Sequence, residues 1–295
     1  TTRLGHDPSV TALATELGTR AGGNPFFVEE AVQALVDAGR LQGERGHYHL
    51  PQALDAWVIP DSVHSLLAAR IDRLPEQSKT LLQAAAVIGE AFPAEHLATL
   101  LEWPVAQCET VLGLLLAQDF LRLVADDGAA QYEFRHTLMQ EVAESLLLDS
   151  QRQRLHARIS ALMEAHHPPD AVGHAASVCI AFHWAAAQQW AKAGEWNLQA
   201  ARWAGTRDMG ITIEQFQLAL RHLDLAAPEP RVTQHRIAAR AALIRMAQFT
   251  PVPREDVERA FAEGQSLAAE AHDVAGAAEM TISYGNEMLH RADAD

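Results

Sequence analysis

The sequence contains few cysteines: Cys108 and Cys179 are the two among 295 residues. Two cysteines supply neither a disulfide framework nor a zinc finger, and we expect both to be small buried residues of an intracellular protein. Long apolar runs are also missing, since none approaches the roughly 18 residues that cross a bilayer. The N-terminus lacks the basic and apolar pattern of a signal peptide. These absences predict a cytoplasmic protein with no membrane partner.

Basic residues are scarce. The chain has 23 Lys and Arg against 38 Asp and Glu, which gives a net charge of −15 at pH 7. Phosphate groups are bound by clusters of basic residues, so this balance argues against a nucleic-acid partner. Hydrophobic residues make up 48% and charged residues 21%, as in a globular protein of about two domains.

Known catalytic and phosphate-binding motifs are absent. The chain contains no G-x-x-x-x-G-K-[ST] phosphate loop, no G-x-G-x-x-G, no H-E-x-x-H and no G-x-S-x-G. Its 15 histidines are scattered. The best-spaced of them, His47 and His49, have only Glu44 as a third candidate ligand, so we interpret them as solvated. We therefore predict that this chain has no catalytic residue, metal site or cofactor of its own and is not itself an enzyme.

Helix signals dominate the first 58 residues. Asp7–Ser9 places a capping oxygen before a proline, which predicts a helix over Val10–Arg20. Pro25 opens a second helix that ends near Ala38, because apolar residues recur there at helical spacing. Residues 39–50 contain glycines between short alternating stretches, as in a small hairpin. The whole chain is predicted to be mainly α.

A second group of helices and two short strands follows in residues 59–148. Helix starts are indicated at Ile59–Ser62, Pro75, Pro93 and Pro104, and a helix end at Gly89. Phe120–Val124 and Gln131–Phe134 are predicted strands around the turn Asp126–Gly128. Three helices and a two-stranded wing are typical of a winged-helix domain.

That domain is not predicted to read DNA. Its candidate recognition helix, which begins at Pro104, contains no Lys or Arg through Val111. Between Ser78 and His136 there are three basic and eight acidic residues, which would repel phosphates. A mechanical or interaction role is favoured.

Residues 149–295 carry only helix signals. Alanine-rich segments are expected to break at Gly194, Gly210, Pro228–Pro230 and Pro251–Pro253. This pattern predicts a tetratricopeptide-like helical repeat array. Four tryptophans recur in its first part: Trp184, Trp190, Trp196 and Trp203. They could form a ligand groove or pack between helices, and packing is favoured.

Three stretches together resemble a known class of proteins. They are Gly22–Glu30; Ile59–Val63 continuing through Ala69–Pro75 to Leu82–Gly89; and Phe134–Ala143 followed by Leu155-His156. In this order and spacing they resemble the segment after the ATPase core in bacterial signal-transduction ATPases of the STAND class. The resemblance is close over residues 10–165 and looser over the repeats.

The resemblance implies specific nucleotide contacts. The phosphate loop and the Mg²⁺-binding acid of the class lie in an upstream P-loop domain, followed by a helical lid, a winged helix and a repeat sensor. The lid motif of the class contains a proline that packs near adenine, and this motif matches Gly23 and Pro25. A winged-helix histidine that contacts the phosphates of ADP matches His136. Alternatively, Pro25 only starts a helix and His136 only caps one.

The function implied is that of a regulatory and sensor segment of a nucleotide-switched ATPase, which would use ATP or ADP with Mg²⁺. Its expected partners are the upstream P-loop domain of the same chain and a protein or small-molecule inducer on the repeats. We expect the parent protein to be linked to a class III adenylate/guanylate cyclase. A LuxR-type transcriptional activator and a protein-binding scaffold are the alternatives. The missing initiator Met and missing phosphate loop suggest a piece of a longer protein.

Overall fold

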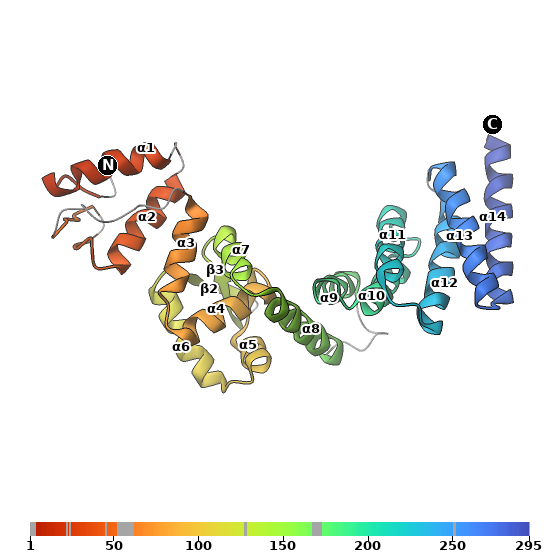
Figure 1. Ribbon diagram of the computed structural model, residues 1–295, viewed down its shortest axis with the longest axis horizontal. Helices are drawn as coiled ribbons and strands as arrows, with labels where there is room; N and C mark the ends of the chain where they lie inside the picture. Colours follow the sequence, from red (N-terminus) through yellow and green to blue (C-terminus); the bar gives the residue numbers. More distant parts are fainter. Residues whose placement is uncertain are drawn as a thin grey trace. The chain divides into compact units, whose positions relative to one another are not determined.

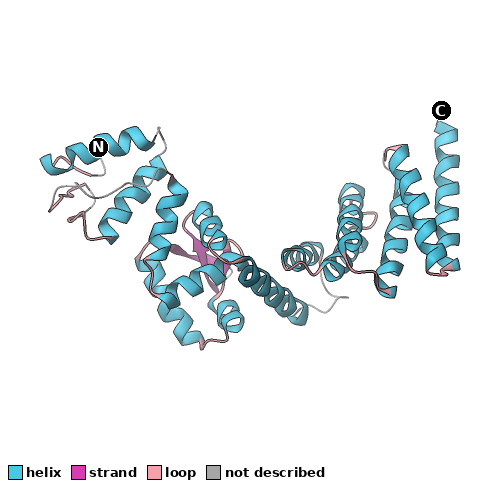
Figure 2. Cartoon of the chain, in the orientation of Figure 1, coloured by secondary structure: helices cyan, strands magenta, loops and turns pink. Residues whose placement is uncertain are grey.

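The computed structural model describes residues 4–21, 23, 25–44, 46–51, 62–126, 129–166, 173–249 and 252–294. The fold is mainly α-helical with one small sheet, as the sequence predicted (Figure 2). The chain forms two compact units, Thr1–Leu148 and Asp149–Asp295, which are described separately below.

The first unit begins with two helices that share an apolar core. A 3₁₀ turn at Pro8–Val10 leads into α1 (Thr11–Ala21), and α2 is Pro25–Asp37. The predicted cap at Asp7 is confirmed, since its Oδ1 accepts a hydrogen bond from the Ser9 N–H at 2.9 Å. The expected hairpin in residues 39–50 is reduced to a single antiparallel bridge between Gln42 and His49.

The rest of the first unit surrounds a three-stranded antiparallel sheet of order β1-β3-β2. Its helices are α3 (Val63–Asp72), α4 (Glu76–Ile88), α5 (Ala94–Leu101), α6 (Val105–Ala117) and α7 (Thr137–Ser145). Its strands are β1 (Ala91–Phe92), β2 (Leu121–Asp126) and β3 (Ala129–Phe134).

Most sequence signals in this region are confirmed. Pro75, Pro93 and Pro104 precede α4, α5 and α6, and Gly89 ends α4. Strand β1 was not predicted, because two residues carry no alternating pattern. The expected start signal at residues 59–61 and the turn residues 127 and 128 lie outside the described residues.

A buried arginine joins the first helices to the sheet. Arg70 of α3 is 3% exposed and pairs with Glu30 and Asp37 of α2, the second at 3.1 Å. Its guanidinium also donates to the Gln118 carbonyl after α6 at 2.9 Å and lies 4.7 Å from the centre of the Phe120 ring. A buried cation must be paired, so this side chain fixes the relative positions of α2, α3 and the end of α6.

The second unit consists of seven helices in the described residues, and consecutive helices pack against each other (Figure 1). They are α8 (Asp149–His166), α9 (His174–Ala186), α10 (Trp190–Ala204), α11 (Met209–Leu225), α12 (Pro230–Ala247), α13 (Arg254–Glu270) and α14 (Val274–Ala294). Helix α12 contacts both α13 and α14. The predicted break at Pro228–Pro230 is confirmed by the start of α12. Residue 251 of the other proline break lies outside the described residues.

The expected helix breaks at Gly194 and Gly210 are wrong. Gly194 is buried inside α10, and Gly210 lies in the first turn of α11, where Asp208 caps the helix. A methyl group at Gly194 would lie 2.5 Å from Cγ of Leu223, so this glycine permits the close approach of α10 and α11. The breaks lie instead between the bounds of the helices, at 187–189 and 205–208.

A glutamate joins the first three helices of this unit. Oε1 of Glu164 in α8 accepts hydrogen bonds from the indole N–H groups of Trp184 in α9, at 2.6 Å, and Trp196 in α10, at 2.5 Å. Both indoles are buried, as expected for packing, whereas Trp203 is exposed. Further along, Arg240 of α12 pairs with Asp224 and Glu263 and so joins α11 to α13.

In the described part of the chain, no single helix has the length and apolar character needed to cross a membrane. Helices α5 and α6, which are bent against each other, reach that length and apolar character only when the two are taken together.

Replacing Arg70 tests the ionic connection. Arg70→Met leaves Glu30 as a buried, unpaired charge, and we expect the free energy of unfolding of the first unit to fall by about 3–5 kcal/mol. Urea-dependent hydrogen exchange of α2 and α3 measures this loss. The additional change Glu30→Leu should restore part of it.

Lys79→Met is the control, because Lys79 and Asp72 form an exposed pair at 2.5 Å that contributes at most about 1 kcal/mol. Equal losses in the Arg70 and Lys79 variants would contradict the role of the buried pair.

Replacing Gly194 tests the close helix contact. Gly194→Ala forces a methyl group against the buried Leu223, so we expect the second unit to lose about 1–3 kcal/mol of stability, measured by thermal unfolding. The same change at Gly285 in α14 meets no atom within 4 Å and should stabilise by up to about 1 kcal/mol. Similar effects at both positions would refute this account of α10 and α11.

Candidate functional site

His136 occupies the position between β3 and α7. It is the residue immediately before the first turn of α7, and its backbone is extended, with φ of −145°. His136 is the N-cap residue of α7, as the alternative interpretation predicted, but its imidazole makes no capping hydrogen bond to the helix. His136 is half-buried.

The imidazole of His136 instead contacts the start of α2. The ring centres of Phe26 and His136 lie 4.3 Å apart, with the planes inclined at 58°. Phe26 follows Pro25, the first residue of α2, which is exposed. The structure therefore brings His136 against Phe26, the residue that follows the predicted site residue Pro25 in the sequence.

The glycine turn before α2 is partly described. Gly23 is exposed, has φ of +88° and has open space where a side chain would lie. This left-handed backbone is easy only for glycine. The helix-start interpretation of Pro25 is confirmed, while its contact with adenine stays a prediction. Residues 22 and 24 lie outside the described residues.

A polar cavity of about 240 Å³ lies beside His136. It is lined by Glu90, Arg122, Glu133, Phe134, Arg135, His136, Thr137 and Gln140. The two guanidinium groups are partly neutralised, because Arg122 pairs with Glu133 at 2.6 Å and Arg135 with Asp119 at 2.9 Å. Gln140 is held by its hydrogen bond to the Ala86 carbonyl at 3.0 Å.

These groups are suited to binding an anion. The imidazole of His136 and the exposed hydroxyl of Thr137 are hydrogen-bond donors at the start of α7, where the helix dipole favours negative charge. The carboxylates of Glu90 and Glu133 limit the positive potential. Among the described residues there is no cluster of three or more side chains that could hold a metal ion.

Sequence reasoning named His136 and Pro25 but missed the role of Phe26. Phe26 precedes Glu30 by four residues in α2, so the two side chains lie on one face of the helix. That face meets Arg70 and His136, and the contact could not be read from the spacing of apolar residues alone.

No protein-family model matches the chain. A curated protein of Rhizobium meliloti (strain 1021), described as uncharacterized protein R02095, is 29% identical over 145 residues. That similarity covers 47% of this chain and 13% of the other protein, so the chain spans only a small part of its relative.

The contact between Phe26 and His136 can be tested by NMR. Phe26→Leu removes the aromatic ring current, so the imidazole protons of His136 should show the largest chemical-shift change among the 15 histidines. Val28→Leu, a half-buried position on the same helix, is the control and should leave His136 unchanged. An unchanged His136 signal in the Phe26 variant would show that the two rings are not in contact.

Proposed function

We propose that this chain is the regulatory and sensor segment of a nucleotide-switched ATPase of the STAND class. The contact between Phe26 and His136 carries the proposal, because it joins two stretches that resemble this class and contain the residues expected to contact nucleotide. Residues 1–58 would be the helical lid and residues 59–148 the winged helix. Residues 149–295 would be the tetratricopeptide-like sensor.

The order of elements supports the winged-helix assignment. Helices α4, α5 and α6 are followed by the hairpin of β2 and β3, and β1 lies between α4 and α5 and pairs with β3. Winged-helix domains that read DNA do so through their third helix, which corresponds to α6 here. Helix α6 contains no Lys or Arg that could contact DNA phosphates. We therefore assign it an internal, mechanical role.

The packing of the second unit supports the sensor assignment. Consecutive helices pack in pairs, and α12 contacts α14 as well as α13, as expected where one helix pair stacks on the next. An array of this kind offers a surface to a protein or small molecule. An inducer that binds one state of the array better than the other would shift the switch toward that state.

The residues around His136 fit a nucleotide phosphate. The half-buried imidazole lies between the start of α2 and a polar cavity, and it makes no capping bond that a phosphate would have to replace. In the parent protein, the His136 N–H would donate to a phosphate oxygen of ADP, while Pro25 and Gly23 would lie against the adenine. Such a contact would stabilise the closed state, because a hydrogen bond to a charged group is stronger than a neutral one.

The complete reading frame provides the first test. It should encode a phosphate loop with its Mg²⁺-binding acid upstream of Thr1, and its absence would refute the proposal. A cyclase domain upstream would support our expected output, and a LuxR-type helix-turn-helix downstream would support a transcriptional activator instead.

His136→Ala in that complete protein is the second test. The variant loses one charge-assisted hydrogen bond, so ADP should dissociate about tenfold faster or more and basal output should rise. Stopped-flow release of a fluorescent ADP analogue measures the rate. The matched control is His290→Ala, an exposed histidine of α14, which should leave release unchanged. Identical release rates in the His136 variant and the unmodified protein would eliminate the phosphate contact.

A further inference from the structure

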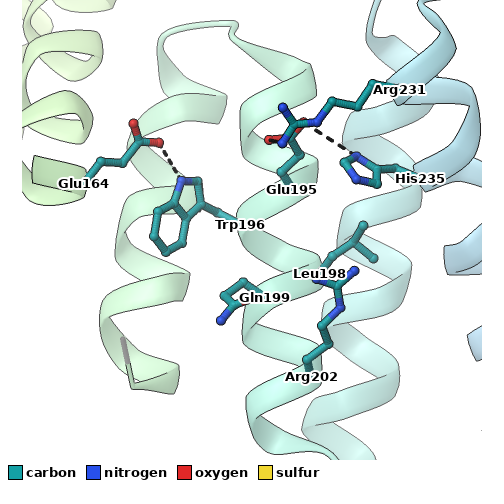
Figure 3. A pocket seen from close by; sticks show the side chains of 8 residues that line it. All are labelled: Glu164, Glu195, Trp196, Leu198, Gln199, Arg202, Arg231 and His235. Carbon is teal, nitrogen blue, oxygen red and sulfur yellow. Dashed lines mark hydrogen bonds and ion pairs between the residues drawn. The ribbon is translucent and has the colours of Figure 1, made fainter. Parts of the chain in front are cut away.

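A second cavity lies wholly within the helical repeats. Its volume is about 360 Å³, within the range of small-molecule sites. It is lined by Glu164 of α8; Glu195, Trp196, Leu198, Gln199 and Arg202 of α10; and Arg231 and His235 of α12. Figure 3 shows Glu164 with Trp196 on one side and Glu195 with Arg231 and His235 on the other.

The two carboxylates of this cavity are already compensated. Glu195 pairs with two nitrogens of Arg231: Nε lies 3.1 Å from Oε1, and an Nη donates a hydrogen bond to Oε2 at 3.1 Å. Glu164 accepts two indole N–H groups and lies 3.9 Å from Nζ of Lys192. Both acids therefore already have donors within the protein.

One basic residue of the cavity, Arg202, is not compensated. Arg202 is exposed and has no ion-pair partner among the residues that the structure describes. Nδ1 of His235 is buried and has no hydrogen-bond partner within the described chain, with the nearest Glu195 oxygen at 3.6 Å. That nitrogen has almost no exposed surface and faces Glu195, so the guanidinium of Arg202 is the charged group left for a ligand.

His235 does not add a second cation to the cavity. Burial lowers the pKa of His235 below its ordinary value, and the nearby Arg231 and Arg202 act in the same direction against the opposing effect of Glu195. Its imidazole is therefore mainly uncharged at pH 7. An anion in this cavity would therefore meet the positive charge of Arg202 and no charge from His235.

We propose that this cavity binds a small organic carboxylate. The carboxylate pairs with the guanidinium of Arg202, and the apolar body of the ligand lies against Trp196 and Leu198. A bidentate pair with Arg202 favours the planar carboxylate. The role of this cavity as the inducer site of the sensor rests on the function proposed above. The binding of a carboxylate to the cavity does not depend on that function.

Benzoate is the probe, added to the complete 295-residue chain. Because the Trp196 indole N–H lies in the wall of the cavity, its NMR signal should shift saturably, while the signal of the exposed Trp203 stays in place. Benzamide, which has the same shape without the charge, should leave the Trp196 signal unchanged. Saturable binding of both compounds alike would overturn the role of the charge.

Arg202→Gln should weaken benzoate binding about tenfold or more, because a hydrogen-bonded charge pair is lost. Arg221→Gln, at an exposed arginine of α11 outside the cavity, should bind like the unmodified chain. Circular dichroism confirms that both variants fold.

Unaltered binding by the Arg202 variant would overturn the proposal. A response to inorganic phosphate without one to benzoate would overturn the carboxylate assignment, and no response to benzoate up to millimolar concentration would overturn the site. These outcomes concern the repeat unit alone, so they are distinguishable from failure of the nucleotide contact at His136.

Discussion

The buried guanidinium of Arg70 is the constraint on which the first unit depends. It must be paired because a desolvated charge without a partner costs several kcal/mol, of order 3–5 when one member of a buried pair is removed. Its partners lie on α2 and at the end of α6, so satisfying the charge brings these elements together. Glu30 and Phe26 lie on one face of α2, and docking Glu30 on Arg70 places Phe26 against His136. The ion pair and the ring contact of the candidate site are thus made by the same face of α2.

The second unit repeats this principle with different groups. Glu164 joins α8, α9 and α10 through two indole hydrogen bonds, and Arg240 joins α11, α12 and α13 through two carboxylates. The alanine-rich helices have small apolar contact surfaces, and directional polar contacts add specificity to their packing. Gly194 shows the other requirement, a close approach of backbones that any larger side chain prevents.

Both cavities offer donors to anions although the chain carries a net charge of −15. The two facts are compatible because charges beyond about 8 Å are screened at physiological salt, so the nearest side chains decide the local potential. In the first unit the arginines beside His136 already have carboxylate partners. In the second unit Arg202 lacks one among the described residues, and the carboxylate proposed for the repeat cavity would supply it.

The sequence by itself determined the mainly helical fold, most helix starts and the two longer strands, because prolines, caps and apolar periodicity act within a few residues. It also marked Gly23, Pro25 and His136 as one set, through a resemblance rather than through their spacing. Only the tertiary structure decided that Phe26 meets His136, that Arg70 holds α2 on α3, and that Gly194 lies inside a helix instead of ending one. The repeat cavity could likewise be found only from the tertiary structure, since its basic and acidic side chains come from three helices. Contacts between residues far apart in sequence depend on how helices pack, and that packing is fixed by buried charges and close approaches that leave no local pattern.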